Sequence, residues 1–185
     1  MSAHTAISID EFWEKYADSD EGRWEYDDGQ LIELPMPDYL HIAIVGRICA
    51  LLTNRWPTFL SGPELDCKVT YNQVRRPDVA AVKFSEVQGR YPDPEHPVYL
   101  AVEVLSPGHS RSVAKTFVDA VSKYRDAYAP WGVPYCWILD PHTRTAWHSE
   151  NGFRQPVAHL EAGEIALEAA EIFEVLSSMP EGERK

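Results

Sequence analysis

The sequence predicts an α/β domain of the α+β type, in which helices flank a mixed, curved β-sheet. Two apolar, β-branched runs, residues 76–82 and 98–105, have the composition of buried strands. Apolar residues recur at helical spacing between residues 39 and 56. With 185 residues and a hydrophobic content of 44%, the chain can form a sizeable core. We therefore expect one domain over residues 1–180 and a disordered tail at residues 181–185.

The composition argues against several classes of protein. Apolar runs are too short for a membrane span, and the first 20 residues lack the basic and apolar regions of a signal peptide. The three cysteines, Cys49, Cys67 and Cys136, are odd in number and far apart, so they form neither a disulfide framework nor a zinc-binding pattern. We expect a cytoplasmic protein with reduced thiols and no membrane association.

The net charge of −12 argues against a nucleic-acid partner, because phosphate binding normally needs a basic surface. The charge is uneven along the chain. Residues 1–40 carry 11 acidic and two basic residues, and residues 161–185 carry seven acidic and two basic residues. Residues 41–160 carry 13 lysines and arginines against 11 acidic residues. The central part is therefore not acidic, although the overall charge remains the strongest argument against a protein that binds nucleic acid on its own.

Two carboxylates, Asp78 and Glu103, interrupt the two strand-like runs. A buried carboxylate is costly unless it is paired, hydrogen-bonded or bound to a cation. If the runs are neighbours in a sheet, a divalent cation between the carboxylates removes their repulsion, and Mg²⁺ prefers such oxygen ligands. The alternative is that both are ordinary acids at strand ends, one capping a loop and one paired with an arginine.

The N-terminal half contains clear start and stop signals. Ser8 can cap a helix that runs to about residue 17, and Asp38 can cap a helix that Pro57 ends. Asp28-Gly29 predicts a type I′ turn between two strands. The expected elements are a helix at 8–17, strands at 23–27 and 30–33, a helix at 39–56, a strand at 64–71, and a loop at 84–97.

The C-terminal half is expected to alternate helices and strands. Apolar residues at helical spacing predict a helix over residues 111–128, with Pro130 and Gly132 after its end. Asn151-Gly152 predicts a second hairpin at the edge of the sheet. The expected elements are a helix at 111–128, strands at 134–139, 144–149 and 153–158, and a helix at 166–177.

Several segments, taken in order, resemble one family. Pro77-Asp78 followed by Glu103-x-Leu105-Ser106 looks like the PD-(D/E)xK nuclease superfamily. More closely, the chain resembles the Uma-two family of endonucleases, a bacterial family with a restriction-endonuclease-like fold. Residues 24–33 resemble its acidic hairpin, His41 matches a histidine at the start of its long helix, and residues 132–141 resemble its late strand. The resemblance implies a metal-dependent endonuclease that hydrolyses phosphodiester bonds in DNA.

The resemblance also implies a set of metal ligands. Asp78 and Glu103 would bind Mg²⁺ or Mn²⁺, helped by the backbone carbonyl of Val104 or Leu105. Glu25 would be an additional acid at the site, although the sequence alone favours an exposed strand carboxylate. His41 would support the ligands or approach the scissile phosphate or Glu25, and the alternative is a core histidine with its hydrogen bonds satisfied.

The nuclease pattern also needs a lysine, and here the sequence departs from the family. The position expected after Glu103-Val104 holds Leu105, so the lysine is sought on the following helix. Lys123 is the first candidate and Lys115 the second. Counting back from Gly132, however, the family's lysine falls on Tyr124, one position away, which is about 100° around a helix. Lys123 can therefore also be read as a solvated helix residue.

Three interpretations of function remain open. The first is an active DNA endonuclease. The second is a catalytically inactive nuclease-fold protein that binds nucleic acid or a protein, which the acidic balance and the displaced lysine favour. The third is a scaffold in which Asp78 and Glu103 pair with Arg75, Arg76 or Arg111. A homodimer is compatible with each of them, because a small nuclease domain often dimerises to cut both strands.

Overall fold

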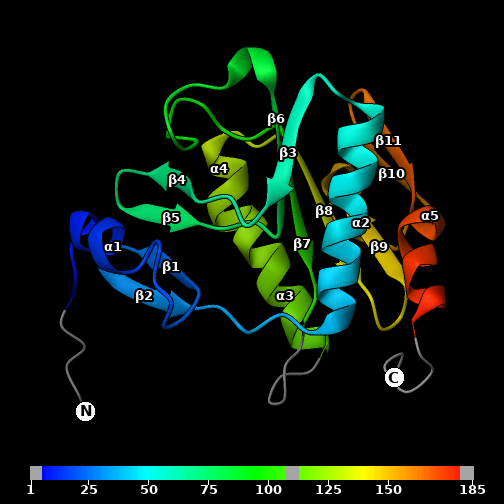
Figure 1. Ribbon diagram of the computed structural model, residues 1–185, viewed down its shortest axis with the longest axis horizontal. Helices are drawn as coiled ribbons and strands as arrows, with labels where there is room; N and C mark the ends of the chain where they lie inside the picture. The colour runs from blue at the N-terminus through cyan, green and yellow to red at the C-terminus, as the bar shows by residue number, and fades with distance from the viewer. Residues whose placement is uncertain (1–5, 107–112, 180–185) are drawn as a thin grey trace.

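The computed structural model describes residues 6–106 and 113–179, which form a mixed sheet with helices on both faces (Figure 1). The main sheet of the described chain has five strands in the order β3-β6-β7-β8-β9. β7 and β8 run parallel, and the other neighbouring pairs are antiparallel. The predicted α+β class is therefore confirmed. The strands are β3 (Phe59–Pro63), β6 (Val79–Lys83), β7 (Leu100–Val104), β8 (Tyr135–Asp140) and β9 (Thr145–His148).

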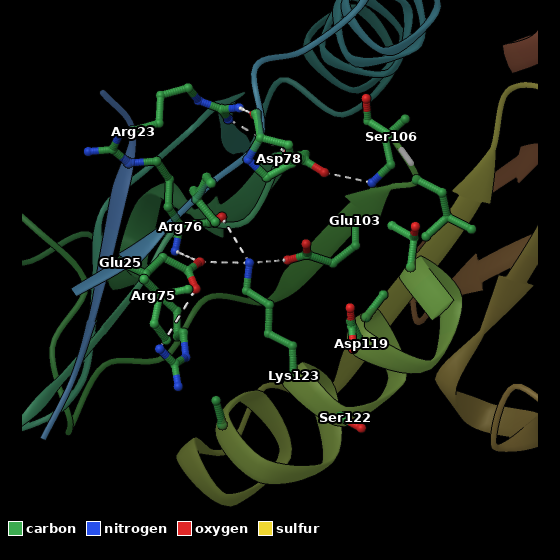
Figure 2. Close-up of a pocket in the computed structure, with 18 of the residues that line it drawn as sticks. Arg23, Glu25, Arg75, Arg76, Asp78, Glu103, Ser106, Asp119, Ser122 and Lys123 are labelled. Atoms are coloured by element: carbon green, nitrogen blue, oxygen red, sulfur yellow. Dashed lines mark hydrogen bonds and ion pairs between the residues drawn. The ribbon is translucent and has the colours of Figure 1, made fainter. Parts of the chain in front are cut away.

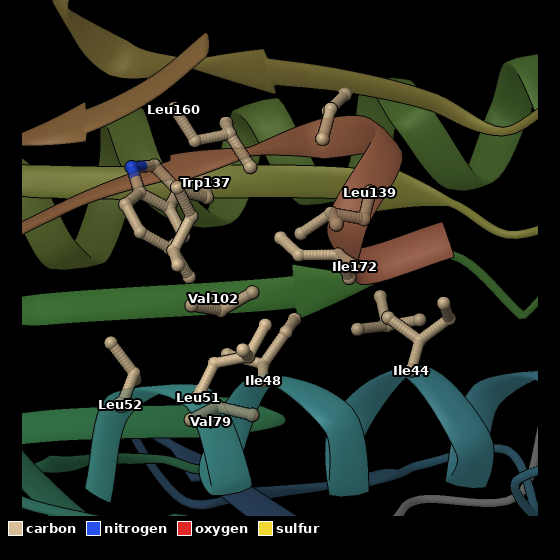
Figure 3. Close-up of a cluster of buried hydrophobic side chains, with 14 of the residues drawn as sticks. Ile44, Ile48, Leu51, Leu52, Val79, Val102, Trp137, Leu139, Leu160 and Ile172 are labelled. Atoms are coloured by element: carbon tan, nitrogen blue, oxygen red, sulfur yellow. The ribbon is translucent and has the colours of Figure 1, made fainter. Parts of the chain in front are cut away.

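The helix α2 (Tyr39–Arg55) covers one face of the main sheet. Its apolar stripe meets the side chains that the central strands direct to this face, as Figure 3 shows. The two-stranded sheet of β10 (His159–Ala162) and β11 (Ile165–Glu168), with α5 (Ala169–Phe173), closes the same core. The buried residues at its centre include Ile44, Ile48, Leu52, Val79, Val102, Trp137, Leu139, Leu160 and Ile172.

The opposite face of the main sheet packs against α3 (Val113–Lys123). Successive side chains of a strand point to opposite faces, and β7 shows this clearly. Val102 and Val104 lie in the core under α2, whereas Ala101 and Leu105 lie in the core under α3. Glu103 therefore points towards α3 from within an otherwise apolar strand.

A smaller sheet lies to one side of the main sheet (Figure 1), with strand order β2-β1-β5-β4. Helix α1 packs against it around the buried side chains of Phe12, Tyr26 and Val74. The predicted β1–β2 hairpin is confirmed, because Asp28 and Gly29 adopt φ angles of 44° and 91° as a type I′ turn requires. The elements are α1 (Ile9–Lys15), β1 (Trp24–Asp27), β2 (Gln30–Glu33), β4 (Cys67–Thr70) and β5 (Gln73–Arg75).

Both predicted helix caps are present. The Ser8 hydroxyl accepts a hydrogen bond from the backbone N–H of Glu11 at 3.1 Å, and the Asp38 carboxylate accepts one from the N–H of His41 at 2.8 Å.

Within the described residues, no helix combines the length and the apolar character that a membrane span needs.

Three strand predictions were wrong. The strand β3 was missed because it contains Gly62 and ends at Pro63, which an edge strand tolerates. The predicted strand 153–158 does not form, since Gly152 and Phe153 take φ angles of 67° and 57° and turn the chain away. The segment between the strands expected at 64–71 and 76–82, for which no strand was predicted, contains the short strand β5.

Two helix predictions also need correction. The last helix begins at Ala169 instead of residue 166, because β11 pairs with β10 across a turn at Gly163. The helix predicted at 111–128 continues past residue 128: α3 is followed by a π-helix (Tyr124–Tyr128) and by α4 (Ala129–Trp131). Its predicted start at Arg111 lies outside the described residues, as does the predicted tail at 181–185.

Candidate active site

Asp78 and Glu103 lie side by side at one end of the main sheet (Figure 2). The antiparallel register pairs Val79 with Val102, so Asp78 and Glu103 form the next pair along the two strands. The Asp78 carboxylate accepts a hydrogen bond from the backbone N–H of Val104 at 2.7 Å, which fixes one carboxylate against the strand that carries the other. The sheet therefore brings together two acids that are 25 positions apart in the sequence.

The ammonium group of Lys123 lies between Glu25 and Glu103, as Figure 2 shows. Its Nζ atom is 2.7 Å from Oε1 of Glu25 and 2.9 Å from Oε1 of Glu103, and it donates a hydrogen bond to the backbone carbonyl of Arg76 at 3.1 Å. Burial alone lowers the pKa of Lys123, but the neighbouring carboxylates, Glu103 first, raise it well above its ordinary value. The lysine is therefore a fixed positive charge.

Burial strongly affects the carboxyl group of Glu103. Burial, together with the negative charges of Asp78 and Glu25, raises the pKa of Glu103 to about 7. Lys123 and the hydrogen bond from the Tyr128 hydroxyl, which is 2.6 Å from Oε1, oppose this rise. The carboxylate is thus held in a position where additional positive charge favours its ionised form.

His41 reaches the site from the first turn of α2. Its Nε2 atom lies 3.3 Å from Oδ1 of Asp78, and its side chain is almost fully buried. Burial lowers the pKa of His41, but Asp78 outweighs this effect and raises it; conversely, His41 counters the burial of Asp78 and lowers the pKa of that carboxyl. Among the described contacts, His41 meets Asp78 and not Glu25, which was one of the predicted partners.

Arg75, the last residue of β5, and Arg76, which follows it, line the opposite wall of the site. The backbone N–H of Arg76 donates to Glu25 at 2.7 Å, while its guanidinium contacts both oxygens of Asp66 at 2.7 and 3.0 Å. Arg75 pairs with Asp27 at 2.6 Å. In their described ion pairs these two arginines contact neither Asp78 nor Glu103, unlike in the scaffold interpretation. Arg111, the third arginine of that interpretation, lies outside the described residues.

These groups line one pocket of about 430 Å³. Its walls come from β1, β2, the start of α2, the β5–β6 segment, the end of β7, and α3. Leu105 lines the pocket, and its backbone N–H is bonded to the carbonyl of Leu139 at 2.8 Å. Lys115 is exposed on α3 and is not among the described lining residues, so the pocket contains the first lysine candidate and not the second.

The donor groups suit a hard divalent cation. Asp78 and Glu103 offer carboxylate oxygens from adjacent strands, and Mg²⁺ typically takes one or two carboxylates together with water and phosphate oxygens. A ready-made cluster of three or more metal-ligating side chains is not found in the described residues, because Lys123 occupies the space between Glu103 and Glu25. The residues therefore fit a cation bound by Asp78 and Glu103, with Glu25 as a third acid on the far side of Lys123.

The π-helix explains how Lys123 reaches the site despite its displaced position. In a π-helix the hydrogen bonds join residues five apart, as the bond from the N–H of Ala129 to the carbonyl of Tyr124 does. This turn therefore holds one residue more than an α-helical turn, and the additional residue lies between Lys123 and Gly132. It accounts for the offset of one position that the sequence shows.

The same turn carries Tyr128, which sequence reasoning assigned to the apolar stripe of the helix. The signal that could have identified it is the hydroxyl group of a tyrosine at a buried position, which needs a hydrogen-bond partner.

The comparison with known protein families agrees with this geometry. The model of Uma2, described as "Putative restriction endonuclease", matches residues 9–178. The chain belongs to the Uma2 family. The match includes every residue of the candidate site, and it confirms the resemblance inferred from the sequence. Membership in Uma2 supports a nuclease function and hence a nucleic-acid substrate.

Among solved structures, the chain is similar to one described as a putative nuclease belonging to DUF820 from Anabaena variabilis ATCC 29413. The similarity has a TM-score of 0.67 at 20% sequence identity and covers 92% of this chain and 99% of that chain. It supports the restriction-endonuclease-like fold of this Uma2 member. Curated proteins gave no match.

Proposed function

We propose that the chain is an endonuclease that hydrolyses phosphodiester bonds in DNA with Mg²⁺ or Mn²⁺. The observation that carries this proposal is the arrangement of Asp78 and Glu103 on adjacent strands, with the Lys123 ammonium 2.9 Å from Glu103. Two acids can hold a divalent cation and an ammonium can offset charge on a phosphate, and here these groups share one pocket.

Each side chain has a distinct role in the proposed reaction. Asp78 and Glu103 hold the cation, and His41 keeps the Asp78 carboxylate ionised and oriented. When bound, the cation supplies positive charge to the phosphate and promotes the ionisation of water. Lys123 stays protonated, so its ammonium offsets the negative charge that develops on the phosphate. Glu25 and the carbonyl of Arg76 fix the position of that ammonium.

The test is cleavage of supercoiled plasmid and of single-stranded DNA in Mg²⁺, Mn²⁺ or EDTA. We expect wild-type cleavage in either metal, and a loss of about 100-fold or more for Asp78→Ala and Glu103→Ala. Lys123→Met should fall similarly, whereas Lys115→Met, an exposed change on the same helix, should cut like the wild type. A wild-type protein that cuts neither substrate and binds no Mn²⁺ in calorimetry contradicts the proposal.

One observation favours a second candidate, a catalytically inactive module that binds nucleic acid or a protein. The three arginines that line the described part of the pocket each lie close to a carboxylate: Arg23 to Glu64 at 2.8 Å, Arg75 to Asp27 at 2.6 Å, and Arg76 to Asp66 at 2.7 Å. Their positive charge is thus largely neutralised by carboxylates of the same chain. This candidate predicts binding without cleavage in the same assay.

A further inference from the structure

Tyr128 makes a direct contact with one of the proposed metal ligands. Its side chain is fully buried, and its hydroxyl lies 2.6 Å from Oε1 of Glu103. At this distance the hydroxyl donates a short, charge-assisted hydrogen bond to the carboxylate. Tyr128 thus differs from Phe117 and Tyr124 of the same helix, whose described ring contacts are with Trp147 at 4.6 Å and Phe153 at 5.3 Å.

Lys123 and Tyr128 both reach the same oxygen of Glu103, at 2.9 and 2.6 Å. Residues five apart on an α-helix are separated by about 140° around the axis, which would direct the two side chains to different sides. The π-helix reduces this separation, because its hydrogen bonds join residues five apart and so bring two such residues close to each other on successive turns. The ammonium of Lys123 also lies 5.5 Å from the centre of the Tyr128 ring.

Two donors on one oxygen fix the orientation of a carboxylate. With Oε1 held by Lys123 and Tyr128, the carboxyl group of Glu103 cannot rotate without losing a buried hydrogen bond. The described contacts of this side chain all fall on Oε1, so the orientation directs the second oxygen away from both donors. Such support is what holds a metal ligand in its binding position.

We infer that Tyr128 is a positioning residue for the nuclease centre: its hydroxyl, placed by the π-helix, orients the Glu103 carboxylate for a divalent cation. This inference rests on the proposed function. Removal of the hydroxyl leaves Glu103 in the pocket but lets its carboxylate rotate, so the cation binds more weakly. An effect of about 10- to 100-fold on metal affinity is typical when the partner of a metal ligand is removed.

The experiment measures Mn²⁺ binding to the full chain by electron paramagnetic resonance, together with cleavage as a function of Mn²⁺ concentration. The variants are Tyr128→Phe and Tyr124→Phe, which each remove one hydroxyl from the same π-helix. Tyr128→Phe should raise the dissociation constant for Mn²⁺ about 10-fold or more, and saturating Mn²⁺ should recover much of its activity. Tyr124→Phe should match the wild type, and the thermal midpoints of both variants in EDTA report their folding.

The outcomes separate this inference from the proposed function. Wild-type binding and cleavage with equal Mn²⁺ affinity in Tyr128→Phe overturn the inference and leave the proposed function intact. A Tyr128→Phe protein whose activity falls by the same factor at every Mn²⁺ concentration, with unchanged affinity, also overturns it, because that pattern indicates a general structural effect. A wild-type protein that neither binds Mn²⁺ nor cuts DNA contradicts the proposed function and this inference together.

Discussion

Replacement of Lys123 by methionine removes the charge that balances two buried carboxylates. The ammonium lies 2.7 Å from Glu25 and 2.9 Å from Glu103, and the exposures of these two residues are 3% and 9%. Methionine keeps most of the side-chain volume, so the change isolates the charge. Breaking a buried ion pair by removing one partner costs about 3–5 kcal/mol, because the remaining charge is left without compensation.

For a domain of this size, about 1 kcal/mol corresponds to a shift of roughly 2–4 °C in the unfolding midpoint. We therefore expect Lys123→Met to unfold roughly 6–20 °C below the wild type in EDTA at pH 7.5. Urea unfolding under the same conditions gives the free energy directly. Mn²⁺ should restore more stability to this variant than to the wild type, because a cation bound by Asp78 and Glu103 supplies positive charge to Glu103, which has lost its ammonium partner.

The matched control is Lys115→Met, which changes an exposed lysine on the same helix. Surface ion pairs contribute at most about 1 kcal/mol, so this variant should remain close to the wild type. If Lys123→Met loses less than about 1 kcal/mol, or no more than the control, Lys123 does not neutralise the buried acids and the account of the site is wrong.

Three further predictions concern the same site and its frame. Burial raises the pKa of Glu103 from 4.5 to about 7, so the folded metal-free chain holds the proton of this carboxyl group more tightly than the unfolded chain does. The free energy of unfolding should therefore fall as the pH rises from 4.5 to about 7. Glu103→Gln should flatten that fall in urea titrations at pH 5 and pH 8. Deletion of the exposed Arg125 should convert the π-helix into an α-helix that keeps Lys123 in the pocket. Binding of Mn²⁺, measured by electron paramagnetic resonance, should therefore be retained. Loss of binding would contradict the conclusion that the π-helix holds one additional residue between Lys123 and Gly132. Asp66→Ala leaves the largely buried guanidinium of Arg76 without its carboxylate partner, although the bond to the carbonyl of Ala17 remains. It should cost about 3–5 kcal/mol in urea unfolding, and a change below about 1 kcal/mol would show that Asp66 does not anchor this segment.

Local signals in the sequence were sufficient for much of the fold. The caps at Ser8 and Asp38 and the turn at Asp28-Gly29 depend on neighbouring residues, so their chemistry could be read directly. Residues 166–168 of β11 were assigned to a helix because short apolar runs fit a strand and a helix equally well. Their pairing with β10 makes them a strand, and this pairing is a tertiary contact that local sequence signals do not show.

The site itself was predictable in part. Asp78 lies beside Glu103 because their strands are antiparallel neighbours in the sheet, and the family resemblance indicated both residues. Lys123 was the first candidate for the lysine, but the sequence could not decide between a site residue and a solvated one, because the family's spacing falls one position away, about 100° around a regular α-helix. The π-helix that corrects the spacing is stabilised by contacts of Tyr128 with Glu103 and of Tyr124 with Phe153, which come from other elements.

The acidic character of the chain has a direct consequence for the proposed nuclease. The pocket arginines are engaged by Glu64, Asp27 and Asp66, and the ammonium of Lys123 is shared by Glu25 and Glu103. The protein therefore contributes little uncompensated positive charge at the site where a phosphate would lie. In the proposed reaction a divalent cation between Asp78 and Glu103 would supply it, so we expect binding of DNA to depend on the metal and to release few counterions. Affinity that is strong in EDTA and falls steeply with salt would instead indicate a basic surface elsewhere on the chain.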